Sequence, residues 1–196
     1  MNNMSDVKNI LLVGVGGQGT ILTSKILSKG FVENGYDVKM AEIHGMSQRG
    51  GSVTTQIRYG EKVYSPVIEK GCADIIVAFE KCEALRFLDY LKKDGILVIN
   101  SYELHPVTVN IGASIYPSGI TEEYENVVGK ENVHVIDAHS IAEELGNTKC
   151  MNIVLLGALV KMFKLDNIDW KQLIKDSVPE KAIDMNIKAF EKGYEI

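Results

Sequence analysis

The sequence predicts an α/β fold in which a mostly parallel sheet is followed by a helical C-terminal part. A short apolar run, Ile10–Val13, leads into a glycine-rich turn and then into a helical pattern. Two further apolar runs, Ala73–Phe79 and Ile96–Ile99, suit parallel strands that are covered on both faces. After Asp137 the apolar spacing is helical. Because no linker divides the 196 residues, we expect a single Rossmann-like domain over residues 1–196.

Strands and helices are predicted in alternation before this helical part. Val53, Thr55 and Ile57 alternate as in a half-buried strand, and the turn at 59–63 predicts one antiparallel hairpin with residues 63–65. The predicted strands are Ile10–Val13, Val38–Ile43, Ser52–Tyr59, Val63–Ser65, Ala73–Phe79, Ile96–Ile99, Val107–Ile111 and Val133–Ile136. The predicted helices are Gln18–Asn34, Glu80–Leu91, Thr121–Val128, Ser140–Leu145, Asn152–Phe163 and one final helix.

Several residues indicate where helices begin and end. Gly35 is expected to end the first helix in a left-handed cap. Ser177–Glu180 reads as a capping box that starts the final helix, and Gly193 as the residue after its last turn. Asp137, followed by His139 and Ser140, suggests a catalytic triad, but alternate residues of an extended segment point to opposite sides. We therefore expect Asp137 or Ser140 to cap a helix, and no catalytic residue in this chain.

Composition excludes several classes of function. With 21 basic and 26 acidic residues and no basic block, the chain is not expected to bind nucleic acid. The polar start Met1–Asn9 and the lack of a long apolar run predict a cytoplasmic protein without a membrane segment. Cys72, Cys82 and Cys150 are scattered, so we expect buried free thiols and neither an iron–sulfur cluster nor a structural metal.

The glycine-rich turn is the first candidate site. Its spacing, Gly-x-Gly-x-x-Gly, lies between a strand and a helix, where backbone N–H groups of the first helical turn can face an anion. A lysine is missing where a P-loop would need it, so a nucleoside triphosphatase is not expected. The alternative is a tight connection that binds nothing. The residues predicted to form a phosphate cradle are Gly14, Gly16, Gly17, Gln18 and Gly19.

A second polar, glycine-rich segment, residues 42–52, follows the second predicted strand. It leaves the sheet at the end where open α/β sheets bind ligands, so we expect it to lie close to the exit of the first predicted strand. Arg49 offers a planar cation for a phosphate or carboxylate, whereas His44 is more readily explained as a structural hydrogen-bonding residue. The alternative is an ordinary polar surface turn. The predicted ligand-binding residues are Ser47, Gln48, Arg49, Gly50 and Gly51.

A dinucleotide-binding fold would require an acid that holds the ribose. Glu42 lies 28 positions after Gly14, later than the usual spacing of about 20. No hydride-transfer site follows it in the sequence. A free-standing NAD- or flavin-binding oxidoreductase and a nucleotide-binding regulatory module nevertheless remain alternatives.

Together the two segments resemble a known family. The glycine turn from Gly14 and the stretch His44–Val53, HGMSQRGGSV, are similar to the gamma-type domain of 2-oxoacid:ferredoxin oxidoreductases. Within this family the sequence of this stretch most resembles the small (beta) subunit of indolepyruvate:ferredoxin oxidoreductase. The resemblance covers essentially the whole chain.

The resemblance implies a role in an enzyme of several subunits. A larger partner would hold thiamine diphosphate and iron–sulfur clusters and decarboxylate an aryl 2-oxoacid in aromatic amino acid catabolism. Electrons would pass to ferredoxin and the acyl group to coenzyme A. This chain would hold no cofactor alone, complete the site at the subunit interface and help to bind coenzyme A. We also expect an apolar patch beside residues 43–52, through which the isolated chain forms a homodimer.

Overall fold

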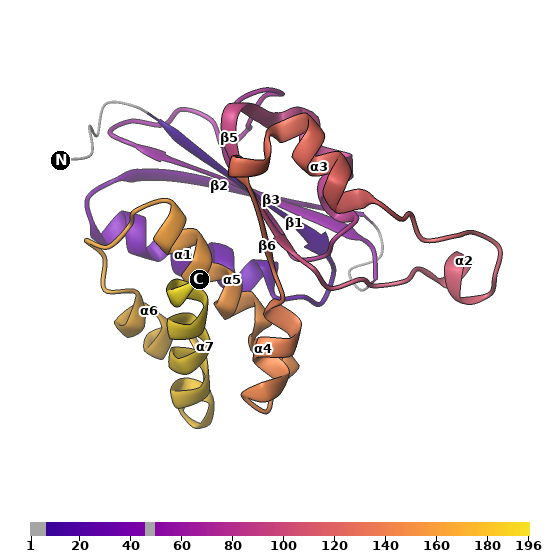
Figure 1. Cartoon of the computed structure of the whole chain (residues 1–196). Coiled ribbons are helices and arrows are strands. Elements are labelled where there is room, and N and C mark those ends of the chain that lie inside the picture. The colour runs from indigo at the N-terminus through magenta and orange to yellow at the C-terminus, as the bar shows by residue number, and fades with distance from the viewer. Residues whose placement is uncertain (1–6, 46–49) are drawn as a thin grey trace.

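The computed structural model describes residues 7–45 and 50–196, and its centre is a six-stranded sheet. The strand order is β2-β3-β1-β4-β5-β6 (Figure 1). β3 is antiparallel to both of its neighbours, whereas β1, β4, β5 and β6 are parallel to one another. The strands are β1 (Lys8–Val15), β2 (Asp37–His44), β3 (Ser52–Gly60), β4 (Ala73–Ala78), β5 (Leu91–Asn100) and β6 (Val133–Ile136). The predicted α/β class with a mostly parallel sheet is thus confirmed.

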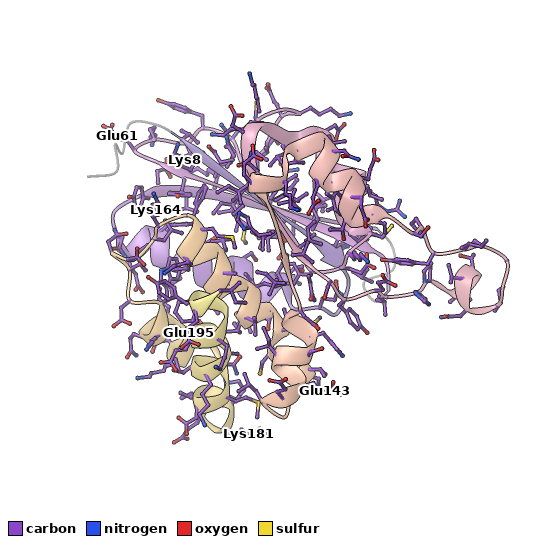
Figure 2. All side chains as sticks on the ribbon, in the orientation of Figure 1. Lys8, Glu61, Glu143, Lys164, Lys181 and Glu195 are labelled. Atoms are coloured by element: carbon purple, nitrogen blue, oxygen red, sulfur yellow. The ribbon has the colours of Figure 1, made fainter. Side chains whose placement is uncertain are left out.

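Helices cover both faces of the sheet (Figure 1). On one face lie α1 (Thr20–Glu33), α4 (Ala138–Glu144), α5 (Met151–Met162), α6 (Trp170–Ser177) and α7 (Ile183–Glu195), of which α7 packs against α5. The other face packs against α3 (Ile120–Val128) and the 3₁₀ helix η1 (Glu83–Tyr90), which replaces the longer helix predicted over residues 80–91. Short elements are α2 (Val107–Asn110), η2 (Lys130–Asn132), η3 (Thr148–Cys150) and η4 (Glu180–Ala182). Charged side chains such as Glu143, Lys181 and Glu195 lie on the outside of the helical layer (Figure 2).

The predicted hairpin between residues 52–59 and 63–65 is wrong. β3 instead forms a hairpin with β2, in which His44 lies opposite Val53, and its other edge pairs with β1. The segment after β3 bonds to side chains rather than to a strand. The N–H of Val63 donates to Asp37 at 2.9 Å and that of Ile68 donates to Gln56 at 2.6 Å. Because β1 and β2 occupy both edges of β3, residues 63–65 cannot pair with β3.

The strand predicted over residues 107–111 is also wrong. The segment forms the single helical turn α2 directly after Pro106, and the N–H of Ile111 donates to the Val107 carbonyl at 3.0 Å. β-Branched residues favour strands because they pack well on a half-buried pleated surface. Here the segment lies outside the sheet, so that advantage is lost.

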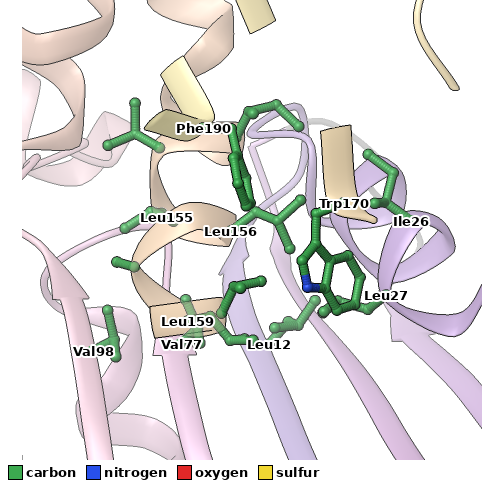
Figure 3. Close-up of a cluster of buried hydrophobic side chains, with 14 of the residues drawn as sticks. Leu12, Ile26, Leu27, Val77, Val98, Leu155, Leu156, Leu159, Trp170 and Phe190 are labelled. Atoms are coloured by element: carbon green, nitrogen blue, oxygen red, sulfur yellow. The ribbon is translucent and has the colours of Figure 1, made fainter. Parts of the chain in front are cut away.

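Two hydrophobic clusters form the core, one on each face of the sheet. Successive residues of β1 alternate between them, since Leu12 joins the larger cluster and Leu11 the smaller one. In the larger cluster, Leu156 and Leu159 of α5 approach Leu12, and Trp170 closes the side toward α1 (Figure 3). Ten consecutive residues of α5 are buried, which is typical of a helix enclosed on all sides.

Two predictions about the final helix are wrong for related reasons. Ser177 ends α6, and its hydroxyl donates to the Leu173 carbonyl at 2.6 Å instead of capping α7. Gly193 lies inside α7, where a Cβ would stand 1.9 Å from the Val154 carbonyl oxygen of α5. This glycine therefore allows two helices to touch at the backbone.

Other local predictions have mixed outcomes. Gly35 has a φ of 85°, as a left-handed cap requires. The Asp137 carboxylate accepts from the Ser140 N–H at 3.1 Å and caps α4 as predicted. Of the three free cysteines only Cys150 is buried, and Cys72 is exposed, contrary to expectation. Among the residues that the structure describes, no helix has the length and apolarity that a bilayer crossing needs.

Candidate functional site

The glycine turn joins β1 to α1 and owes its shape to glycine at two positions. Gly17 and Gly19 have φ angles of 108° and 85°, which side-chain-bearing residues rarely adopt. A Cβ on Gly19 would also lie 2.6 Å from Asn152 Nδ2, which donates to the Gly19 carbonyl at 3.3 Å. At Gly14 a Cβ would lie 2.9 Å from the Cβ of Phe79. Backbone strain and close packing thus both require glycine here.

Gln18 is turned into the protein rather than toward a ligand. The side chain is 7% exposed. Its Oε1 accepts from the Val15 N–H at 2.8 Å, and its Nε2 donates to the Phe79 carbonyl at 3.2 Å. Both ends of the amide therefore hold the turn against β1 and the end of β4. We assign Gln18 a positioning role in place of the predicted ligand contact.

Replacing Gln18 with leucine is expected to lower the free energy of unfolding by about 2–3 kcal/mol, because a buried N–H and a buried carbonyl lose their partner. Urea unfolding measures the change. Gln172→Leu is the matched control, since the Gln172 amide bonds Asp176 on an exposed surface. Equal midpoints for the two variants would contradict the positioning role.

The second predicted segment meets the first at the carboxyl end of β1. The N–H of Gly16 donates to the Gly51 carbonyl at 2.8 Å, and the N–H of Gly50 donates to the Gly16 carbonyl at 3.2 Å. Gly50 has a φ of 74°. The predicted proximity of the two segments is thus confirmed. Ser47, Gln48 and Arg49 lie outside the described residues.

A groove of about 680 Å³ opens beside the glycine turn. Its walls come from the turn, the start of α1, the end of β2 and the start of β3, with Ser177 at one end. The N-cap of α1 is Gly19, which offers no capping side chain, and the first turn carries no acidic residue. The positive end of the helix dipole and the first N–H groups, which have no partner within the helix, therefore lie at the groove, an arrangement that favours anions.

Three charged or titratable side chains line this groove: Lys25, Glu42 and His44. Lys25 is exposed and makes no hydrogen bond or ion pair with any residue that the structure describes. His44 Nδ1 lies 3.0 Å from the Gly45 carbonyl oxygen, a local contact. Lys25, which the sequence analysis did not single out, lies six positions after Gly19, less than two helical turns beyond the glycine motif.

Glu42 is poorly placed for the ribose of a dinucleotide. It lies near the end of β2, opposite Thr55 of β3. Because β3 separates β2 from β1, Glu42 is two strands from the glycine turn, about 10 Å at the usual strand spacing. A ribose-binding acid is expected on the strand next to β1, so this topology disfavours the dinucleotide alternative.

A second cavity, of about 540 Å³, also lies at the carboxyl end of β1. Its central group is Glu80, which follows β4 and is 2% exposed. One carboxylate oxygen accepts from the N–H groups of Cys82 and Glu83, at 2.8 and 2.9 Å. The other accepts from the Leu104 N–H at 3.1 Å and the Tyr116 hydroxyl at 2.6 Å. Burial and this bond raise the pKa of Tyr116 far above its usual value.

Sequence analysis missed Glu80. The available signal was an acidic residue directly after a fully apolar strand, a position that is buried when the strand is central. Since the described residues satisfy the carboxylate with four donors, we assign it a structural role.

The sequence matches the pyruvate ferredoxin/flavodoxin oxidoreductase family over residues 9–196. It is 42% identical to the indolepyruvate oxidoreductase subunit IorB of Pyrococcus horikoshii, over 94% of this chain and 93% of that one. It is 28% identical to the 2-oxoglutarate synthase subunit KorC of Methanothermobacter marburgensis, over 96% of both chains.

A solved structure shares the fold. The 2-oxoglutarate:ferredoxin oxidoreductase from Magnetococcus marinus, with 2-oxoglutarate, coenzyme A and succinyl-CoA bound, superposes with a TM-score of 0.72 at 22% identity. The match covers 97% of this chain and 31% of that longer chain. The protein described here belongs to the pyruvate ferredoxin/flavodoxin oxidoreductase family.

Proposed function

We propose that this chain is the non-cluster subunit of a thiamine-diphosphate-dependent oxidoreductase that passes electrons from an aryl 2-oxoacid, such as indolepyruvate, to ferredoxin. The difference between two relatives supports the substrate class. Identity is 42% to a subunit named for indolepyruvate and 28% to one named for 2-oxoglutarate. Both matches span more than nine tenths of this chain, so the difference does not arise from a partial alignment.

The proposal divides the work between two chains. Within residues 7–45 and 50–196, no group of three or more His, Cys, Asp or Glu side chains could hold a metal ion. We therefore assign thiamine diphosphate and the iron–sulfur clusters to a larger partner subunit, which carries out decarboxylation and electron transfer. This chain completes the site at the interface and contributes no catalytic residue.

The observation that carries the role in ligand binding is the uncapped N-terminus of α1 at the wall of the groove. Coenzyme A presents phosphates, which match the free N–H groups there and the cation of Lys25. Ile21 and Ile43 add apolar surface to the same wall, against which the uncharged pantetheine chain of coenzyme A can lie. Arg49, between β2 and Gly50, is the second proposed cation.

Co-expression with the larger subunit tests the division of labour. We expect reduction of a viologen dye by indolepyruvate only when both chains are present, and thiamine and iron only in the larger one. Turnover that does not depend on this chain would contradict the proposal. A dinucleotide retained by the pure chain, or protection by NAD against heat, would favour the free-standing oxidoreductase or a nucleotide-sensing module instead.

Coenzyme A affinity tests the groove. In the assembled enzyme, Arg49→Ala and Lys25→Ala are each expected to raise the Kd for coenzyme A about tenfold, because each removes one charge-assisted phosphate contact. Isothermal titration measures the Kd. Lys29→Ala is the matched control, since Lys29 lies on the same helix but pairs with Asp176 at 2.9 Å. A variant whose affinity equals that of the control removes that cation from the site.

A further inference from the structure

The connection between β5 and α3, residues 101–119, forms an arm that projects from the body with α2 near its tip (Figure 1). Residues 104–121 contain no Asp, Glu, Lys or Arg, in a chain in which these types make up 24% of the residues. The charged side chains labelled in Figure 2, among them Lys164 and Glu195, all lie on the body. An uncharged projection on an otherwise charged surface calls for a physical reason.

The arm exposes large apolar side chains to solvent. Ile115 is 93% exposed, Val107 73% and Ile111 72%, and Leu104 at the base is partly exposed. Single exposed apolar residues are ordinary on soluble proteins, but four within twelve positions concentrate exposed apolar surface on one short segment. Such a surface is typical of an interaction site.

The arm is held in one conformation rather than left as a loose loop. At its base, the buried carboxylate of Glu80 binds both Leu104 and Tyr116, which are on opposite sides of the tip. At the tip, the Thr108 carbonyl accepts from the N–H groups of Ala113 and Ser114, at 2.8 and 3.0 Å. A preorganised arm loses little conformational entropy when it binds.

The position of the arm indicates what covers it. Its base lines the 540 Å³ cavity together with Gly50 and Ser52, so it is continuous with the segment that meets the glycine turn. A chain seated on the arm would therefore also cover the edge of the candidate site. A symmetric homodimer would need a self-complementary patch of about 800 Å² on each copy. A narrow projection suits insertion into a groove on a different chain.

From these observations we infer that the arm inserts into an apolar, uncharged groove on the larger, thiamine- and cluster-bearing subunit, and that this contact holds the two subunits together. The inference rests on the proposed function, which supplies the partner. Because residues 104–119, the part of the arm beyond Glu103, contain no Asp, Glu, Lys or Arg, the contact is expected to depend little on ionic strength.

Binding of the purified larger subunit to arm variants, followed by surface plasmon resonance and native mass spectrometry, tests the inference. Ile111→Ser/Ile115→Ser is expected to raise the Kd about a hundredfold, since buried apolar anchors at an interface contribute about tenfold or more each. The matched control is Tyr64→Ser/Val67→Ser, which removes two exposed side chains from the segment after β3, where the end of β3 lies beside the start of β1. Circular dichroism checks that both variants are folded.

The outcomes distinguish a failure of the proposed function from a failure of the inference about the arm. If the wild-type chain does not bind the larger subunit, the proposed function fails. If the wild type binds and the arm variant binds equally well, the arm inference fails while the proposed function stands. If the arm variant turns a homodimer into a monomer without changing partner binding, a second copy covers the arm and the inference is overturned. A steep loss of affinity between 50 and 500 mM salt, over which the Debye length shortens about threefold, would also count against an uncharged contact.

Discussion

Replacing Gly193 with alanine is expected to lower the free energy of unfolding by about 4 kcal/mol, a large part of the stability of a domain. A Cβ at this position would lie 1.9 Å from the Val154 carbonyl oxygen and 2.7 Å from the carbon bonded to it. These are backbone atoms of the buried helix α5, so they cannot move aside as a flexible side chain would. The helices must separate, and the packing between them is lost along their length. Urea or thermal unfolding measures the change.

Two further variants make this prediction specific. Gly157→Ala adds a methyl group to the other helix at the same contact, 2.2 Å from the Phe190 carbonyl oxygen, and should destabilise to a similar degree. Lys192→Ala changes an exposed neighbour on α7 and should shift stability by less than about 0.5 kcal/mol. If Gly193→Ala and Lys192→Ala unfold at the same urea concentration or temperature, the two helices do not touch at the backbone.

The glycine turn shows what a local sequence pattern can establish. An apolar run followed by closely spaced glycines and a helical pattern specifies a strand, a turn and a helix within about 25 neighbouring residues. The strand, the turn and the helix are therefore found where they were predicted, whereas the left-handed φ angles of Gly17 and Gly19 were not part of the prediction. Its contact with Gly50 and Gly51 could also be expected, because the second segment leaves the sheet at the same edge.

Strand pairing could not be predicted in the same way. The alternation in Ser52–Tyr59 indicates a strand but does not show which strands it pairs with, and its partners in β1 lie up to 51 positions away. The predicted strand nearest in the sequence, residues 63–65, is the partner that a local pattern favours. In the structure β3 instead lies between β1 and β2. The same insertion separates Glu42 from the glycine turn. Long-range pairing is selected by burial of the whole sheet, which no short pattern contains.

Two residues whose types serve more than one structural purpose were also assigned the wrong role from the sequence. Gly193 resembles a C-terminal cap because glycine often follows a last turn, but here it serves close helix packing. Gln18 lies within the glycine motif and so resembles a ligand contact, but its amide is used by Val15 and Phe79. In both cases the deciding partner is a backbone group brought near by the tertiary fold.

Replacing Glu80 with alanine is expected to cost about 4 kcal/mol of unfolding free energy and to release the arm from the body. Four donors lose a shared acceptor, and two of them, Leu104 and Tyr116, hold the base of the arm. Each bond to a buried carboxylate contributes about 1.5–3 kcal/mol, and partial rehydration of the freed groups offsets part of the sum. Urea unfolding measures the loss of stability, and hydrogen exchange at the Leu104 amide measures the release of the arm.

Glu103→Ala is the matched control, because Glu103 belongs to the same arm but pairs with Lys81 on the surface, where an ion pair contributes about 0–1 kcal/mol. A double-mutant cycle of Glu80→Gln with Tyr116→Phe isolates the bond between carboxylate and hydroxyl, and we expect a coupling energy above about 1 kcal/mol. If Glu80→Ala matches the control in stability and Leu104 exchanges no faster than in wild type, the carboxylate does not hold the arm. Faster exchange together with weaker binding of the larger subunit would instead connect this buried residue to assembly, since a disordered arm must be ordered again before it can insert.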